Sequence, residues 1–193
     1  MTALAAADTS RRRDSVIVLA AATLTAALTG PGQTIGVSVF IDDLVTDLDL
    51  SRSEVSTAYL IGTLGGALLL PSVGRFIDRR GVRISQIVVG IAFVAALLNM
   101  STVSGFVTLA IGFVGIRLLG QGSLSLVSMI TVSLRFVQNR GIALGIFSTV
   151  SAGLMALVPL ALAVTIDQVG WRDAWIVAAL VIALTVVPLA LLA

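Results

Sequence analysis

Long apolar runs alternate with short polar stretches along the chain, and six of these runs reach or approach the length of a membrane crossing. About 20 helical residues span the roughly 30 Å of hydrocarbon in a bilayer. The six runs are Val16–Phe40, Val55–Val73, Ile84–Met100, Phe106–Leu134, Ile142–Ile166 and Ala174–Ala193. They lack the period-two alternation of membrane β-strands, and a helix pairs its own backbone amides within lipid. The pattern therefore predicts an all-α membrane protein with six transmembrane helices.

The composition supports this class and limits the chemistry. Of the 193 residues, 58% are hydrophobic and 11% are charged, whereas an ordinary soluble domain has about 25% charged residues. The chain has no cysteine and no histidine, which excludes thiol nucleophiles, imidazole bases and the commonest zinc sites. The predicted spans also lack paired carboxylates. We therefore expect that the protein is not an enzyme and that it binds no metal ion and no cofactor.

Charged residues separate by the segment in which they fall. The N-terminal tail (residues 1–14) and the second and fourth loops carry an excess of arginine: Arg11, Arg12, Arg13, Arg75, Arg79, Arg80, Arg83, Arg135 and Arg140, against Asp8, Asp14 and Asp78. The first and fifth loops are acidic: Asp42, Asp43, Asp47, Asp49, Glu54, Asp167 and Asp173, against Arg52 and Arg172. Arginine excess marks the cytoplasmic side, so both termini are expected in the cytoplasm. The orientation of the protein in the membrane explains the basic residues, so they give no reason to expect nucleic-acid binding.

The second half of the chain repeats scarce residues of the first half in the same order. At an offset of 88 or 89 residues the pairs are Gly32 and Gly120, Gln33 and Gln121, Arg52 and Arg140, Gly65 and Gly153, Pro71 and Pro159, Asp78 and Asp167, Gly81 and Gly170, and Arg83 and Arg172. We interpret residues 15–103 and 104–193 as two three-helix repeats in one membrane domain. Because three is odd, the copies cross the membrane in opposite senses, and such inverted repeats are typical of secondary transporters.

Two glycine-rich segments occupy corresponding places in the two repeats. They are GPGQTIG at Gly30–Gly36 and LLGQGSLS at Leu118–Ser125, both near the middle of a predicted span. One interpretation is close packing between helices through small residues. The other is an interrupted helix that exposes Gln33, Thr34 and backbone carbonyls to a cavity.

Arg117 is the one charged residue near the centre of a predicted span. A lone charge there costs at least ~2.5 kcal/mol, so it should face protein or a water-filled cavity. Helical spacing places Gln121 and Ser128 on its face and Ser125 at the edge of that face. A guanidinium with amide and hydroxyl neighbours suits a small anion. The alternative roles for Arg117 are packing, hydrogen bonding to the carbonyls of a broken helix, and gating. Tyr59 is a further polar candidate for the site, and it could equally be an ordinary residue of a helix interface.

The segment GRFIDRRGVR, residues 74–83, resembles the loop signature of the major facilitator superfamily. The residues that match the signature are Gly74, Asp78, Arg79, Gly81 and Arg83. A second segment, RFVQNRGIALGIFSTVSAG from Arg135 to Gly153, is similar to monocarboxylate-transporter-like and oxalate/formate-antiporter-like members. The first run lacks the acidic-glycine-aromatic signature of the animal monocarboxylate carriers, which favours a bacterial relative in the inner (plasma) membrane.

The resemblance also implies an arginine four residues before a glycine in the fourth helix. Here Arg117 stands three residues before Gly120 and five before Gly122, so the register differs by one. Because a helix turns by about 100° per residue, this offset changes the direction in which the arginine points.

The resemblance implies the amino-terminal six-helix half of a twelve-helix secondary transporter for small organic anions such as monocarboxylates, working by alternating access. Its expected partners are the lipid bilayer, the anion, protons as a candidate coupling ion, and a second six-helix half, either a missing C-terminal domain or a second copy.

The resemblance further implies a cytoplasmic latch, made of the five signature residues with Arg135 and Arg140, in which Asp78 pairs with one of those arginines. A solvated basic loop is the alternative to the latch. A non-transporting membrane sensor or assembly module is the alternative function.

Overall fold

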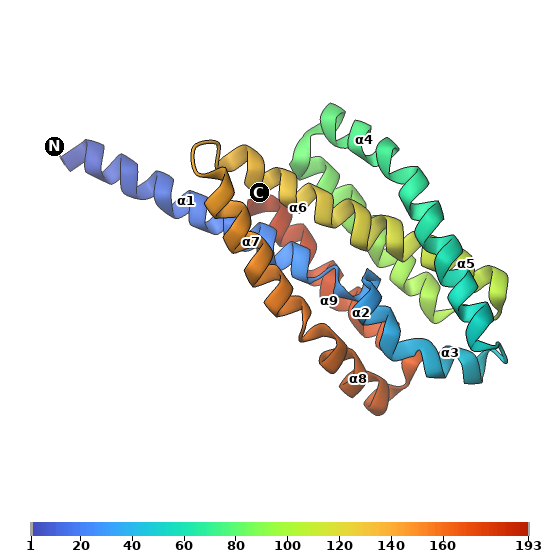
Figure 1. The fold of residues 1–193 in the computed structure, drawn as a ribbon. Helices are drawn as coiled ribbons and strands as arrows, with labels where there is room; N and C mark the ends of the chain where they lie inside the picture. Colours follow the sequence, from blue (N-terminus) through green and yellow to red (C-terminus); the bar gives the residue numbers. More distant parts are fainter. Residues whose placement is uncertain (1, 193) are drawn as a thin grey trace.

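The computed structural model describes residues 2–192, with side chains described for residues 13–186 and 188–191. The side chains of Asp8, Arg11 and Arg12, which entered the predicted orientation, lie outside this part, as do Met1 and Ala193. The described chain is helical and contains no strand (Figure 1). Its elements are α1 (Thr2–Ala27), η1 (Gly30–Gly32), α2 (Thr34–Val37), η2 (Ser38–Phe40), α3 (Ile41–Asp47), α4 (Arg52–Ser101), α5 (Phe106–Ile116), η3 (Arg117–Leu124), α6 (Ser125–Arg135), α7 (Arg140–Met155), α8 (Val158–Val169) and α9 (Trp171–Leu192).

The first predicted span is interrupted within GPGQTIG. α1 ends at Ala27, a 3₁₀ turn covers Gly30–Gly32, and Gln33 is extended with φ −86° and ψ 160° before α2 begins. Pro31 stands at the start of the turn, where its missing N–H is no loss and its ring stops α1 from continuing. The interpretation of this segment as an interrupted helix is confirmed.

The second and third predicted spans are two helices that meet at a kink and together carry the label α4. α4 begins at a capping box in which Ser51 Oγ accepts from Glu54 N at 3.2 Å, and the Glu54 carboxylate accepts from Ser51 N at 2.8 Å. Gly81 is its one non-helical residue, with φ 76° and ψ 167°, a conformation that glycine adopts without steric cost. The ribbon folds back on itself within this element (Figure 1).

This geometry corrects the predicted second loop at residues 74–83, which is helical apart from Gly81. A single glycine with positive φ reverses the chain, so no loop is needed there. Because α4 holds two of the six apolar runs, the described residues contain five helices long and apolar enough to cross a membrane. The arrangement with six crossings stays a prediction.

The fourth predicted span is helical throughout but changes its hydrogen-bonding pattern in the middle. α5 passes into the eight-residue π-helical segment η3, which passes into α6. Within η3, Ser123 Oγ donates to the carbonyl of Leu118, five residues earlier, at 2.7 Å. This π segment covers the glycine-rich Leu118–Ser125 almost entirely, and such segments occur often at functional sites.

The fifth predicted span is broken near Pro159. α7 ends at Met155, a turn follows, and α8 starts at Val158. Gly170 then joins α8 to α9 with φ 85° and ψ 161°. The backbone angles at Gly170 are close to those at Gly81, which stands 89 residues earlier.

Close glycine contacts bring α4 against α5 and η3, where the site lies. A Cβ on Gly62 would stand 2.4 Å from the Phe113 Cβ, and one on Gly66 would stand 3.1 Å from the Leu118 nitrogen. Small residues at such crossings let membrane helices approach closely. Phe113 is fully buried in the core that α4, α5 and α9 form.

Arg172 joins three segments at the acidic end of the bundle. Its Nη1 donates to the carbonyls of Ser101 and Val103, each at 2.9 Å, and its Nη2 pairs with Asp47 at 2.8 Å. Its guanidinium also lies 4.3 Å from the ring centroid of Trp171. We call this set of contacts the Arg172 clamp, and it holds the end of α4, α3 and the start of α9 together.

Candidate functional site

Arg117 lies at the junction of α5 and the π segment, and its side chain is 8% exposed. Its Nε donates to Thr63 Oγ1 at 3.1 Å, and its Nη1 donates to Thr34 Oγ1 at 3.3 Å and to Gln121 Oε1. Among the described residues, Nη2 makes no hydrogen bond and no carboxylate lies within ion-pair distance. Three of the five guanidinium N–H groups are therefore satisfied by neutral partners and two are left without one.

Tyr59 supports the same guanidinium from α4. The Arg117 guanidinium carbon lies 4.8 Å from the Tyr59 ring centroid, within the range of a cation–π interaction. The Tyr59 hydroxyl lies 2.7 Å from Thr34 Oγ1, and its ring meets Phe113 edge-on at 5.5 Å between centroids. Tyr59 thus connects the broken first helix to the arginine.

Two small cavities flank this cluster. One, of about 140 Å³, is lined by Arg117 and Gln121 together with Thr63, Gly66, Ala67, Leu70 and Gly122. The other, of about 130 Å³, includes Thr34, Tyr59 and Phe113 in its lining. Neither lining includes an acidic side chain. The cavity beside the Arg117 guanidinium therefore carries a net positive charge and has room for a small ligand.

A second polar group lies next to the first, around Gln33. Its Nε2 donates to Thr29 Oγ1 at 3.0 Å and approaches Ser125 Oγ at 3.5 Å. The predicted substrate residues consequently divide between two groups. Arg117, Gln121, Thr34 and Tyr59 surround the guanidinium, while Gln33 and Ser125 meet on the side of Thr29.

Among the described residues, Ser128 makes no hydrogen bond to either group, and its place on the face of Arg117 stays a prediction. Its hydroxyl donates to the carbonyl of Leu124 at 2.8 Å, and the residue is 1% exposed. The prediction assumed regular α-helical spacing, and the π segment between Arg117 and Leu124 alters that spacing. Thr63 and Thr29 were missed. Thr63 stands four residues after Tyr59 on the same helix and so shares its face, whereas Thr29 and Gln33 are separated by the 3₁₀ turn.

The comparison with known protein families settles what kind of protein this is. The family model of the Major Facilitator Superfamily matches residues 16–193. The chain belongs to the major facilitator superfamily. Members are in general membrane transporters rather than enzymes, so this is a multi-pass membrane transporter chain whose partners are the bilayer and a small-molecule substrate. No curated protein matches the chain.

The one-residue register difference expected from the resemblance falls within the π segment. Arg117 and Gly122 are five residues apart, and both lie in η3. A π turn contains one residue more than an α turn, and α6 continues beyond it.

The superfamily loop signature is exposed in this structure, and the predicted ion pair of Asp78 is not formed. Within the described residues, Asp78 makes no ion pair with Arg135 or Arg140. Arg75 donates to Ser72 Oγ at 2.9 Å, while Arg79 and Arg83 are exposed. Gly81 supplies the reversal of α4, and a Cβ on Gly74 would meet nothing within 4 Å. The latch stays a prediction.

Proposed function

We propose that this chain is the amino-terminal six-helix half of a secondary transporter that carries small organic anions, such as monocarboxylates, by alternating access. Arg117 is the anion-binding residue in this proposal. The observation that carries it is the Arg117 Nη2 group, which belongs to a buried side chain and has no partner among the described residues.

A buried guanidinium without a counter-ion favours a ligand that supplies one. Leaving a charge buried and unpaired costs several kcal/mol, and a carboxylate can satisfy two parallel N–H groups of an arginine at once. The neutral partners Thr34, Thr63 and Gln121 orient the guanidinium without neutralising it. An arriving anion would therefore meet a pre-oriented, unneutralised positive charge.

Alternating access requires a second wall for the cavity, which a second six-helix half would provide. The exposed face of α7 favours this partner, because a Cβ on Gly141, Gly145 or Gly153 would meet nothing within 4 Å. Glycines spaced by four on a membrane helix permit close helix packing.

We propose that both termini and the exposed latch residues lie in the cytoplasm of a bacterial cell. The latch would act when the second half closes over the exposed face of α7. Protons are the proposed coupling ion.

Anion binding by the purified chain tests the proposal without requiring the second half. Calorimetric titration with lactate, formate and oxalate should detect binding to the wild-type chain, and Arg117→Gln should weaken it by at least about tenfold, since charge-assisted hydrogen bonds contribute about 1.5–3 kcal/mol. Arg80→Gln is the matched control because Arg80 is exposed on α4. Undiminished affinity in Arg117→Gln, or equal binding of the neutral lactamide, would refute the assignment.

A further inference from the structure

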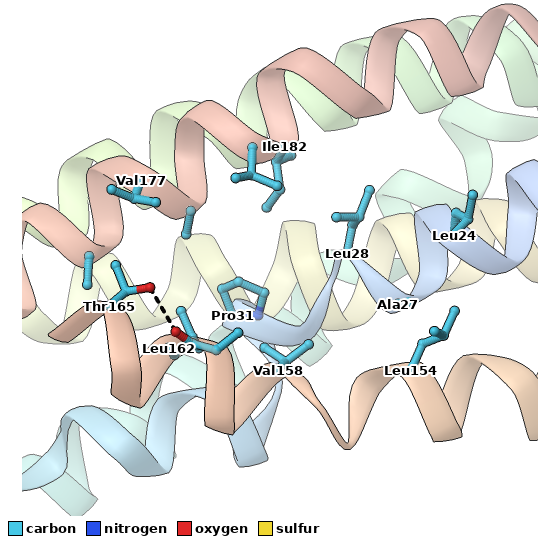
Figure 2. A pocket seen from close by; sticks show the side chains of 14 residues that line it. Leu24, Ala27, Leu28, Pro31, Leu154, Val158, Leu162, Thr165, Val177 and Ile182 are labelled. Carbon is cyan, nitrogen blue, oxygen red and sulfur yellow. Dashed lines mark hydrogen bonds between the residues drawn. The ribbon is translucent and has the colours of Figure 1, made fainter. Parts of the chain in front are cut away.

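A third cavity, larger than those beside Arg117, lies between α1, the α7–α8 pair and α9. Its volume is about 310 Å³. Figure 2 shows side chains from all three walls pointing into it, among them Leu28 and Pro31 from the α1 side, Val158 and Leu162 from α8, and Val177 from α9.

The lining is almost entirely apolar. Thr165 is the one hydroxyl residue that lines the cavity, and its Oγ1 donates to the Ala161 carbonyl at 2.7 Å (Figure 2). Apolar cavities of about 150 Å³ stay dry and take up apolar molecules. Water and anions are therefore poor occupants, and this cavity is chemically unlike the one at Arg117.

The walls of the cavity lie on candidate membrane spans, so we expect its rim to face the hydrocarbon of a bilayer. Its walls belong to three candidate membrane spans, Arg13–Gly32, Arg140–Val169 and Trp171–Leu191. Three of the lining side chains are also partly exposed: Leu24 by 45%, Val177 by 39% and Val181 by 45%. Acyl chains are the medium that such a rim meets.

The apolar lining and the position of the walls in candidate membrane spans favour a hydrocarbon occupant. A single acyl chain is flexible and can enter the space between the helices. We propose that the cavity binds one acyl chain of a bilayer phospholipid, independently of the anion site.

Trp175 provides a nearby probe of this occupancy: it does not line the cavity, and its ring stacks on Phe40 at 4.1 Å between centroids, but it is adjacent in sequence to a lining residue. Trp171→Phe leaves Trp175, which is 0% exposed and follows the lining residue Ala174. This variant would be placed in phosphatidylcholine vesicles with and without bromine atoms at the middle of the acyl chains. Because bromine quenches indole fluorescence at short range, an acyl chain in the cavity should quench Trp175.

Matched variants separate the cavity from the surrounding bilayer. Ala161 and Ala152 are both exposed, but only Ala161 lines the cavity. In the Trp171→Phe background, Ala161→Phe should lower the bromine quenching by roughly half because the added ring fills the site, and Ala152→Phe should leave it unchanged. Val177→Phe with its control Leu180→Phe repeats the comparison on α9, should Ala161→Phe fail to fold.

Equal quenching in the filling variant and its control would overturn the proposal. If light scattering then also showed two copies per particle, a second copy of the chain would be the occupant instead. Circular dichroism of each variant checks that the helix content is retained.

Discussion

Gly32 and Gly120 pack directly against each other where the broken first helix crosses the π segment. A Cβ on Gly32 would stand 3.2 Å from the Gly120 Cα, and one on Gly120 would stand 3.3 Å from the Gly32 Cα. The two residues are separated by 88 positions and were paired in the predicted repeat. Their contact brings Thr34, two residues beyond Gly32, within hydrogen-bond distance of Arg117.

Gly32→Ala is expected to destabilise the chain by about 1–3 kcal/mol, the usual cost of overpacking. The new Cβ would stand 2.6 Å from the Ile116 carbonyl oxygen, a backbone atom that cannot turn aside. Gly145→Ala is the control, because a Cβ there meets nothing within 4 Å, and helix propensity should stabilise it by at most about 1 kcal/mol. Denaturant unfolding in detergent measures both, and equal stabilities would contradict the close crossing.

Arg172→Gln should lower the free energy of unfolding by about 1–3 kcal/mol, because two carbonyls and a carboxylate lose a charged donor. The carbonyls belong to Ser101 and Val103, and the carboxylate to Asp47. Arg52→Gln breaks an exposed pair with Asp42, whose side chains are 71% and 78% exposed, and should cost less than about 1 kcal/mol. Unfolding of both variants at the same ionic strength provides the comparison, and an equal loss would contradict the Arg172 clamp.

Asp43→Asn should stabilise the chain near neutral pH and reduce its loss of stability with rising pH. Burial, followed by the nearby charges of Asp42, Asp167 and Asp47, raises the pKa of Asp43 above its ordinary value of 3.8. The folded state therefore binds this proton more tightly than the unfolded state, so stability falls as pH rises from 3.8 through the raised pKa.

Unfolding from pH 3 to pH 8 should show that the advantage of Asp43→Asn over the wild type grows across this window. Asp173→Asn is the control, because it removes the same charge at the start of α9 and Asp173 is not among the charges that raise the pKa of Asp43. A pH-independent difference between Asp43→Asn and the wild type would be the contrary result.

Cysteine labelling tests the orientation, since the chain contains no cysteine of its own. Thr46→Cys places a thiol on the acidic end at α3, and Val137→Cys places one at a residue that is 77% exposed between Arg135 and Arg140. A membrane-impermeant maleimide should label Thr46→Cys in intact cells and Val137→Cys only after permeabilisation. The reverse pattern would place the arginine-rich face outside.

Hydropathy predicted the membrane class and the all-helical fold correctly because these are local properties of the chain, while the six crossings stay a prediction. Proline and glycine in GPGQTIG predicted the helix interruption for the same reason. The repeat alignment paired Gly81 with Gly170, and the two have nearly the same unusual backbone angles. The second loop is shorter than predicted, because two helices meet at Gly81 and hydropathy alone does not reveal where one helix ends and the next begins.

The candidate site was only partly predictable. The sequence by itself determined that Arg117 is buried without an acidic partner, since a charge in an apolar run must turn toward protein. Only the tertiary structure decided which neutral groups hold it, because the crossings of distant helices bring Thr63, 54 residues away, and Thr34, 83 residues away, into contact. The π segment, the Arg172 clamp and the apolar cavity likewise depend on how helices meet, and hydrophobic periodicity within one helix does not specify its neighbours.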